Sequence, residues 1–324
     1  MNRTWLIALF LALNVAAGMK PALAQAYPER PVRIIVGYPP GGGTDLVARL
    51  VQQPLSTRWG QPVVIDNRPG ASAIIAADAV AKARPDGYTL LMAYATEVAV
   101  NPVTVKKLPY DPVRDFTPIL RLAGAPLVLA VHPALAAKDV RELVALARAK
   151  PGTLSYSSSG SGSVHHFAGE LFKLQTGADI LHVPYKGSGP AAADAVAGQV
   201  QANFASVASV LRFVQAGRLR ALAVTSKQRS PQMPEVPSMV EAGLADFELT
   251  SWYGLLAPAG TPPAIVAKIH ADVTAVLGSA EIQKSFATQG LDMAGGTPQA
   301  FGAFIREEAA KFARIAKAGN ISAE

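Results

Sequence analysis

The sequence predicts an α/β fold of two lobes, each a mostly parallel sheet flanked by helices, with a ligand cleft between the lobes. From residue 27 onward, apolar runs rich in β-branched residues alternate with amphipathic helical patterns, an alternation typical of parallel sheets covered by helices on both faces. The alternation restarts near residues 123–126, which indicates a second unit. Of the 324 residues, 50% are hydrophobic and none is cysteine, so each lobe must be stable without disulfides.

The first lobe is expected to alternate strands and helices along the chain. Val32 begins an apolar run that reads as a buried strand. Thr44 begins a pattern whose apolar residues recur every three or four positions, the spacing of one helix face. The turn sequence RPDGY, residues 84–88, precedes a third strand. The predicted elements are strand 32–38, helix 44–59, strand 62–66, helix 71–83 and strand 89–93.

The second lobe is expected to repeat this plan. Asp139 precedes a helical pattern and is a good N-cap, because its side chain can accept a hydrogen bond from a free N–H of the first turn. The predicted elements are strand 127–131, helix 139–149, strand 154–157, helix 164–175, strand 180–184, helix 190–197, strand 201–205, helix 209–216 and strand 220–225.

Two amphipathic helices are expected near the carboxyl end. Each begins at a Thr-Pro pair, at Thr261 and Thr297, where Thr can cap the helix and Pro suits its first turn. No strand is left for them to follow, so we expect them to return across the hinge and cover the first lobe. The predicted lobes are therefore residues 25–124 with 254–324, and residues 125–253, with hinge crossings near 123–126 and 247–258.

Residues 1–24 are typical of a secretory signal peptide. Arg3 precedes an apolar stretch that ends at Val15, and Ala22-Leu23-Ala24 is a small-residue cleavage pattern. A membrane anchor is disfavoured, because the stretch is shorter than the roughly 20 residues of a spanning helix. Loss of Arg3 and Lys20 lowers the formal net charge by two, from +7 to +5. The basic residues are scattered along the chain, so no nucleic-acid surface is expected.

Three loops at the expected carboxyl ends of strands have the composition of an anion-binding site. The loop Gly41 to Asp45, GGGTD, leads into the first helix, whose N-terminal N–H groups favour an anion. SSSGSGSVHH, residues 157–166, occupies the matching place in the second lobe, and NRPGAS, residues 67–72, follows the second strand. A tight turn capped by Thr44 or Asp45 is the alternative for the first loop. Because ligands of open α/β sheets sit beyond the carboxyl strand ends, we expect a clamp on a small anion.

Common enzyme signatures are absent from these loops. No G-x-S-x-G occurs around the serine loop, no G-x-G-x-x-G follows the first strand, and the chain has no G-x-x-x-x-G-K-S/T. Zinc at His165, His166 and Glu170 would need further ligands, and H-E-x-x-H is absent, so neither a metal nor a cofactor is expected. A serine hydrolase that uses Ser161 or Ser163 with His166 is kept as an alternative.

Eight segments, in their order and spacing, resemble one known family. They are YPERPVRIIVGYPPGGGTDLVARLV, GQPVVIDNRPGA, ARPDGYTLLM, LPYDPVRDFTPI, HHFAGELF, HVPYKGSGPA, AGRLRALAVTS and GLLAPAGTP. The mature chain thereby resembles the Bug family, the periplasmic substrate-binding proteins of tripartite tricarboxylate transporters. The resemblance implies a two-lobed, periplasmic-binding-protein-like fold. It also implies a monomer in the periplasm that binds a small carboxylate without catalysis and hands it to a membrane permease. A periplasmic sensor, for example acting with a sensor kinase, or a partner-docking protein is the alternative.

In that family, the loops that match residues 41–45 and 157–166 hold a carboxylate largely through backbone amides and water. Trp252 and Tyr253 fit either the core or the pocket wall. The candidate ligand-binding residues are Tyr38, Pro40, Gly41, Gly42, Gly43, Thr44, Asp45, Ala71, Ser72, Thr96, Glu97, Ser159, Gly160, Ser161, Gly162, Ser163, His166, Tyr185, Lys186, Gly187, Ala205 and Ser206.

Three departures from the family pattern bear on the ligand. Residues 72–75, SAII, replace the usual glycines and predict a bulkier, drier wall. Ala205 and Ser206 stand where many members carry an Asp that meets an ammonium group, which disfavours an α-amino acid. Glu97 stands where small polar residues are common. It either faces the cleft, and selects a ligand that has a hydrogen-bond donor, or is a solvated loop residue.

Overall fold

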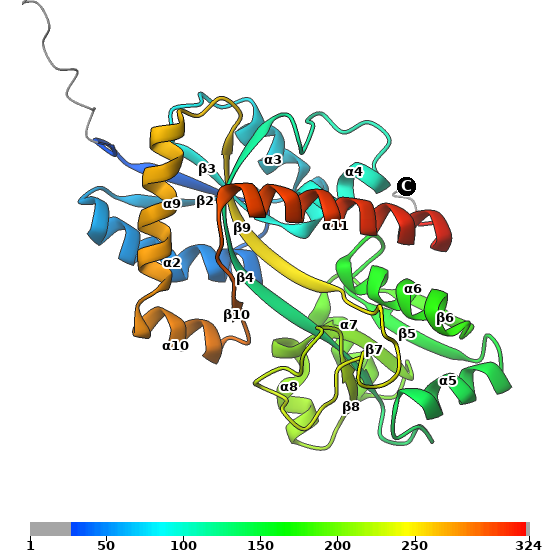
Figure 1. The fold of residues 1–324 in the computed structure, drawn as a ribbon. Coiled ribbons are helices and arrows are strands. Elements are labelled where there is room, and N and C mark those ends of the chain that lie inside the picture. Colours follow the sequence, from blue (N-terminus) through cyan, green and yellow to red (C-terminus); the bar gives the residue numbers. More distant parts are fainter. Residues whose placement is uncertain (1–26, 322–324) are drawn as a thin grey trace, which may run out of the picture.

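The computed structural model describes residues 27–321, so the predicted signal peptide lies outside the described residues. Ten strands form one mixed sheet that runs through both lobes, in the order β2-β1-β3-β9-β4-β7-β5-β6, with β8 and β10 paired to β4. The strands are β1 (Val32–Val36), β2 (Val63–Asn67), β3 (Thr89–Tyr94), β4 (Phe116–Val131), β5 (Leu154–Ser158), β6 (Ile180–Pro184), β7 (Ala202–Ser206), β8 (Arg220–Val224), β9 (Thr250–Pro258) and β10 (Asp292–Met293). The predicted two-lobed α/β architecture is confirmed (Figure 1).

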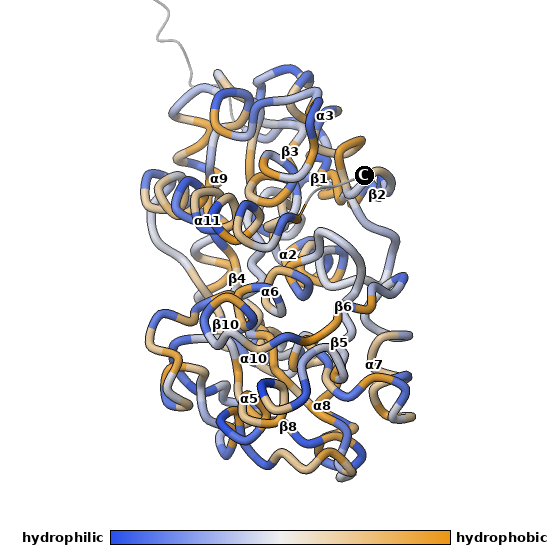
Figure 2. Tube along the Cα trace, turned by 90° about the vertical axis from the view of Figure 1, so that its right-hand side faces the viewer, coloured by the Kyte–Doolittle hydropathy of each residue, from blue (hydrophilic) through white to orange (hydrophobic). Residues whose placement is uncertain are grey.

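Each lobe has a parallel half. In the first lobe β1 pairs in parallel with β2 and β3, and in the second lobe β5 pairs in parallel with β6 and β7. The remaining pairs, which involve β4 or β9, are antiparallel. Figure 2 shows that the strands of both lobes are largely hydrophobic, whereas the outer turns carry most of the hydrophilic residues. The prediction of mostly parallel sheets therefore holds for the parts of each lobe that carry the loops of interest.

Two long strands join the lobes. Sequence patterns predicted a restart near residues 123–126 and a strand that begins only at residue 127, but β4 is a single strand of 16 residues. β9 was expected only as part of the hinge, yet it pairs with β4 from Phe116↔Pro258 to Pro126↔Thr250. Register shifts on the Pro118 side of β4 accommodate the irregular sequence. Both predicted hinge crossings therefore lie within the antiparallel ladder of β4 and β9 (Figure 1).

Ten helices of the described chain cover the sheet. They are α2 (Gly43–Trp59), α3 (Ile74–Ala81), α4 (Asn101–Thr104), α5 (Val140–Ala149), α6 (Val164–Thr176), α7 (Ser188–Val196), α8 (Val207–Gln215), α9 (Pro263–Leu277), α10 (Ala280–Thr288) and α11 (Pro298–Gly319). Asp139 caps α5 as predicted, and accepts a hydrogen bond from Glu142 N at 2.8 Å. α10 was not predicted. None of the helices between residues 27 and 321 is long and apolar enough to cross a membrane.

The predicted helix 71–83 begins later than expected. Ala71–Ala73 form a short turn, η1, in which Ala71, Ser72 and Ala73 all have positive φ, and the regular helix α3 starts at Ile74. Positive φ is costly for residues with a Cβ. Three consecutive residues of this kind therefore mark a constrained turn, which brings Ser72 to the end of the cleft described below.

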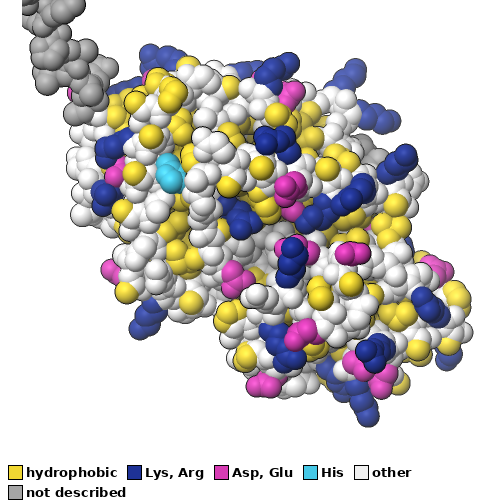
Figure 3. Space-filling model, viewed as in Figure 1, with side chains coloured by type: hydrophobic (Ala, Val, Ile, Leu, Met, Phe, Trp, Pro, Cys, Tyr) yellow, Lys and Arg dark blue, Asp and Glu magenta, His cyan; other side chains and the backbone are white. Residues whose placement is uncertain are grey.

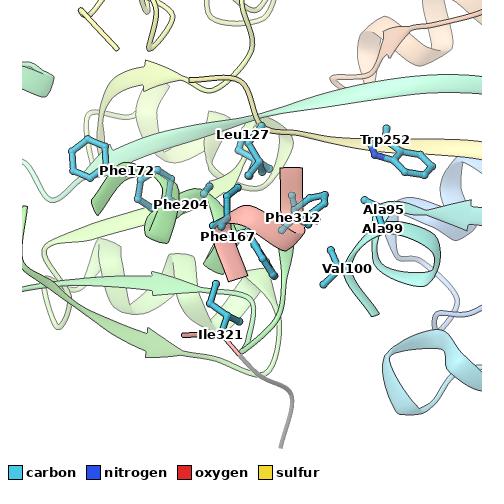
Figure 4. Packing of buried hydrophobic residues seen from close by; sticks show 14 of the residues in the cluster. Ala95, Ala99, Val100, Leu127, Phe167, Phe172, Phe204, Trp252, Phe312 and Ile321 are labelled. Carbon is cyan, nitrogen blue, oxygen red and sulfur yellow. The ribbon is translucent and has the colours of Figure 1, made fainter. Parts of the chain in front are cut away.

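Helix α11 packs on both lobes. We expected it to cover the first lobe, and its Phe301 ring meets Trp252 of β9 edge to face at 5.7 Å between centroids. Its Phe312 ring meets Phe167 of α6, in the second lobe, at 4.9 Å. Figure 4 shows Trp252, Phe167 and Phe312 together with Leu127 of β4, and Phe301 belongs to the same cluster. The two lobes therefore share part of their hydrophobic core along α11.

Candidate functional site

A cavity of about 220 Å³ lies between the lobes at the carboxyl ends of β1, β3 and β5. Tyr38, Ser72, Tyr94 and Thr96 line it from the first lobe, and the segment Ser159 to His165 lines it from the second. Larger hollows of about 650 and 740 Å³ lie elsewhere, one between α6 and α11 and one between α9 and α11. We take the smaller cavity as the candidate site, because it sits where open α/β sheets bind ligands.

The structure brings together eight of the predicted site residues on the wall of this cavity. They are Tyr38, Ser72, Thr96, Ser159, Gly160, Ser161, Gly162 and Ser163. Three lining residues were missed: Tyr94, Val164 and His165. The position of Tyr94 at the end of a predicted strand was the available signal for it, since loops and side chains at that edge of the sheet face the cleft.

At the start of α2, Asp45 already occupies the helix N-terminus. Its side chain is buried and accepts hydrogen bonds from Gly41 N at 2.9 Å, Arg49 Nε at 2.8 Å and Asn67 Nδ2 at 2.9 Å. Burial favours the neutral acid, but the hydrogen bonds from Arg49, Gly41 and Asn67 together hold the pKa of Asp45 below its usual value. This carboxylate offsets the positive end of α2, so the Gly41 N–H is not free to hold a ligand.

Two of the three glycines in the first loop, Gly41 and Gly43, have separate structural roles. Gly41 has a φ of +85°, which favours glycine. A Cβ on Gly43 would lie 2.5 Å from the hydroxyl oxygen of Tyr253, so this position is bare because an aromatic side chain packs against it. Neither residue lines the cavity, nor do Pro40, Gly42, Thr44 and Asp45. The hydrogen bond to Asp45 engages the Gly41 N–H, but no side chain caps α2 itself. The prediction that the loop exposes N–H donors therefore does not hold for Gly41 and stays a prediction for the first turn of α2.

The second loop is held by hydrogen bonds within its own segment. Ser163 caps α6, accepting from His166 N at 3.2 Å and donating to Gly160 O at 2.7 Å. His166 Nδ1 accepts from Gly162 N at 3.1 Å, and its ring stacks on His182 at 3.8 Å between centroids. His166 therefore supports the loop from behind, and the cavity is lined by its neighbour His165 instead.

His165 is a neutral, buried side chain at the cavity wall. Its Nδ1 lies 2.7 Å from Ser159 Oγ, and its Nε2 has no hydrogen-bond partner among residues 27–321. Burial lowers the pKa of His165 to about 4, so the ring carries no charge at neutral pH. His165 can therefore form a hydrogen bond with the serine loop, but it does not attract an anion by charge.

A serine hydrolase is not supported by this geometry. The Ser163 hydroxyl forms hydrogen bonds with backbone groups rather than with the His166 ring. Ser161 forms no hydrogen bond with a histidine in the described part of the chain. Ser158 Oγ lies 2.7 Å from His182 Nε2, which could make this histidine a catalytic base. Burial, however, lowers the pKa of His182 to about 3. A base that weak cannot activate a hydroxyl near pH 7. Among residues 27–321, no group of three His, Cys, Asp or Glu could hold a metal.

Two tyrosines, Tyr38 and Tyr94, line the cavity from the first lobe, and a third, Tyr253, packs behind them beside Gly43. The rings of Tyr38 and Tyr94 lie 5.8 Å apart, and those of Tyr94 and Tyr253 lie 5.3 Å apart. The Tyr94 hydroxyl is 2.7 Å from Ser251 Oγ on β9. Tyr253 thus stands behind the wall, whereas Trp252, its neighbour on β9, is fully buried in the core under α11.

Glu97 is fully buried, so the alternative of a solvated loop residue is wrong, and the predicted ligand-binding residue does not reach the cavity wall either. It lies in a π-type turn, η2 (Thr96–Val100), where we expected a loop. Its Oε2 accepts from the Tyr38 hydroxyl at 3.3 Å and from Tyr94 N at 3.2 Å, while Oε1 has no partner in the described residues. Burial raises the pKa of Glu97 to about 8. Glu97 does not line the cavity but stands directly behind Tyr38.

Other predicted residues support the site without lining it. Gly187 N donates to Ser159 O at 3.2 Å, and a Cβ on Gly160 would lie 3.1 Å from Tyr185 O, so the segment 185–187 backs the serine loop. Ala205 is buried in the core of the second lobe. The predicted residues that do not line the cavity include Ala71, Tyr185, Lys186, Gly187, Ala205 and Ser206.

The cavity has no charged wall. No lysine, arginine, aspartate or glutamate is among its lining residues, which offer hydroxyl groups and backbone N–H groups instead. On the face shown in Figure 3, basic and acidic side chains of both signs are intermixed. An anion in the cavity would be held by neutral donors, among which the first-turn N–H groups of α6 carry a partial positive charge.

Comparison with known proteins gives a consistent assignment. Residues 47–321 match the family described as tripartite tricarboxylate transporter family receptor. The chain is 38% identical to protein BugT of Bordetella pertussis over 319 residues, which is 98% of each chain. A solved R. palustris protein with adipate is 38% identical with a TM-score of 0.81, covering 91% of this chain and 99% of that one. MatC from Rhodopseudomonas palustris with bound malate is 31% identical with a TM-score of 0.77, covering 89% and 99%.

Proposed function

The chain belongs to the tripartite tricarboxylate transporter receptor family and is a solute-binding protein, not an enzyme. On that premise we propose that it captures a small carboxylated compound between its lobes in the periplasm and delivers it to a membrane permease. Residues 1–24 would direct its export. The observation that carries the proposal is the interlobe cavity, where neutral hydroxyl and N–H donors converge at the start of α6.

The chemistry of this wall favours a carboxylate. Ser159, Ser161 and Thr96 place hydroxyl groups around the cavity, and the N–H groups of Val164 and His165 lie in the first turn of α6, where no intrahelical acceptor exists. Two relatives at more than 30% identity were solved with adipate and with malate, both dicarboxylates. A short dicarboxylate or hydroxycarboxylate is therefore the class of ligand we propose for this cavity of about 220 Å³.

A matching carboxylate should raise the melting temperature, whereas its neutral amide should not. Because a ligand that binds only the folded state stabilises it by mass action, a hundredfold excess over the dissociation constant adds about 2.7 kcal/mol. The measurement is a thermal-shift screen of mono-, di- and tricarboxylates, each paired with its amide as the control. Equal stabilisation by acid and amide would show that the wall does not select the anion.

Bound ligand should also draw the lobes together. The ladder of β4 and β9 joins the lobes, and α11 packs on both, so closure is expected as a rotation about this side of the molecule. Small-angle scattering should give a smaller radius of gyration with saturating carboxylate than without it, and the amide should leave the value unchanged. An identical profile at saturation would indicate a rigid cleft.

A further inference from the structure

We propose that Glu97 is a positioning residue that controls the direction of the Tyr38 hydroxyl hydrogen, so that carboxylate binding depends on the proton held by Glu97. This inference rests on the proposed carboxylate-binding function. Tyr38 lines the cavity and Glu97 does not, but the Tyr38 hydroxyl lies 3.3 Å from Glu97 Oε2. A single side chain therefore separates the buried acid from the ligand space.

The surroundings of Glu97 suit a neutral acid better than a carboxylate. The side chain is 0% exposed, and it accepts hydrogen bonds from the Tyr38 hydroxyl and from Tyr94 N. Its Oε1 has no partner in residues 27–321, and no basic side chain in that range forms an ion pair with it. An ionised carboxylate with a bare oxygen in such a place is costly, which agrees with the raised pKa, about 8, caused mainly by burial.

The other titratable groups around Glu97 stay in one state near pH 8. Tyr38 and Tyr94 are half-buried, and loss of contact with water raises the pKa of both, to about 12 for Tyr94. The hydroxyl of Tyr110, from the segment after α4, donates to the backbone oxygen of Glu97 at 2.7 Å, and burial raises its pKa as well. The negative charge of Asp78 in α3 contributes to the raised pKa of Tyr110 but not to that of Glu97.

Helix α11 packs on η2, but none of its charged side chains affects the pKa of Glu97. Its buried acid, Glu308, is paired with Lys311 and accepts a hydrogen bond from Trp252 Nε1 at 3.2 Å. No charged group of α11 contributes to the raised pKa of Glu97. Glu97 is thus the group in this cluster that changes its charge between pH 7 and 9.

The proton on Glu97 determines what Tyr38 can offer a ligand. When Glu97 is protonated, its O–H can donate to the Tyr38 oxygen, so the Tyr38 hydrogen is free to donate to a carboxylate in the cavity. When Glu97 loses this proton to solvent, the Tyr38 hydrogen is drawn to Oε2 and only the lone pairs of the phenol oxygen face the ligand. A carboxylate then loses one hydrogen bond and meets a repulsive oxygen.

Calorimetry with adipate between about pH 6.5 and 9.5 tests this mechanism. Both adipate carboxyl groups stay ionised in this range, since ordinary carboxyl pKa values lie near 4. For the wild type we expect the affinity to fall by about ten- to a hundredfold as the pH rises through about 8. Glu97→Gln has no titratable proton at this position, so its affinity should not change with pH across this range. Tyr38→Phe should bind more weakly, without this pH dependence.

Asp272→Asn is the control. Asp272 is a buried acid of α9 that accepts from Arg58 Nε and Trp59 Nε1, both at 2.7 Å, and it does not line the cavity. This variant should keep the pH profile of the wild type, and circular dichroism of each variant verifies folding. A flat profile for the wild type, or the same falling profile for Glu97→Gln, would overturn the role of Glu97 alone. If adipate fails to bind, the strongest carboxylate of the thermal-shift screen replaces it, and a screen without any binding carboxylate overturns the proposed function as well.

Discussion

Replacing Phe312 by alanine is expected to lower the free energy of unfolding by about 3 to 5 kcal/mol, the range for large aromatic-to-alanine changes in a core. Phe312 is fully buried and packs edge to face on Phe167 in the cluster shared by the lobes (Figure 4). Unlike most core side chains, it ties α11 to the second lobe, so the cavity left by its removal also weakens the contact between lobes. Urea unfolding followed by circular dichroism measures the loss.

Phe304→Ala is the control for this prediction. Phe304 lies on the same helix and its ring meets Trp252 at 5.4 Å, but it is only partly buried. Because less apolar area returns to water when it is removed, a smaller loss is expected. Losses of equal size for Phe304→Ala and Phe312→Ala would contradict the larger contribution expected of the buried Phe312 side chain.

The second large effect is a loss of stability with rising pH, caused by Glu97. In the folded protein burial raises the pKa of Glu97 to about 8, whereas the ordinary value is 4.5. Between these values the folded state holds a proton that the unfolded state has released, so the free energy of unfolding falls as the pH rises from about 4.5 to about 8. At 1.36 kcal/mol per pKa unit, the difference of about 3.5 units corresponds to a total fall of about 5 kcal/mol.

His165 acts in the opposite direction at lower pH. Burial lowers its pKa to about 4 in the folded state, so the unfolded chain takes up a proton first and stability is lost as the pH falls from 6.5 to about 4. The difference between the wild type and Glu97→Gln isolates Glu97, because His165 is present in both. Urea unfolding should show Glu97→Gln gaining on the wild type from pH 5 to pH 8.5. Parallel pH curves for the two proteins would contradict the burial of a protonated Glu97.

Local patterns predicted the elements that depend on local sequence. Strands such as β1 and helices such as α2 and α6 lie within a few residues of their predicted bounds, because apolar runs and helical spacing specify them directly. β4 was predicted only in part, since Gly124 and Pro126 resemble chain breakers. In the folded chain these residues pair with Trp252 and Thr250 of β9, a strand more than 100 residues away, and pairing at that distance leaves no local signal.

The candidate site also has parts that local sequence predicted and parts that depend on residues far away in the chain. The serine loop before α6 was found from composition, because small polar residues at the carboxyl end of a strand suit a ligand loop. The burial of Glu97 could not be read from its neighbours, since α11, some 200 residues later, packs over η2. The roles of the glycine loop were also non-local: Tyr253 fills the space beside Gly43, and Asn67 helps Asp45 to occupy the helix end.

The ladder of β4 and β9 places the two ends of the second lobe next to each other, which would allow this lobe to be exchanged as a unit between related proteins. Pro126 and Thr250, where the chain leaves the first lobe and returns to it, are direct partners in the ladder, so everything between them is an insertion whose two ends already lie side by side. Recombination between relatives at this pair would replace the serine loop while leaving Tyr38 and Glu97 in place. The two halves of the binding site can therefore be inherited separately, provided that the incoming lobe presents to α11 a surface that fits Phe312.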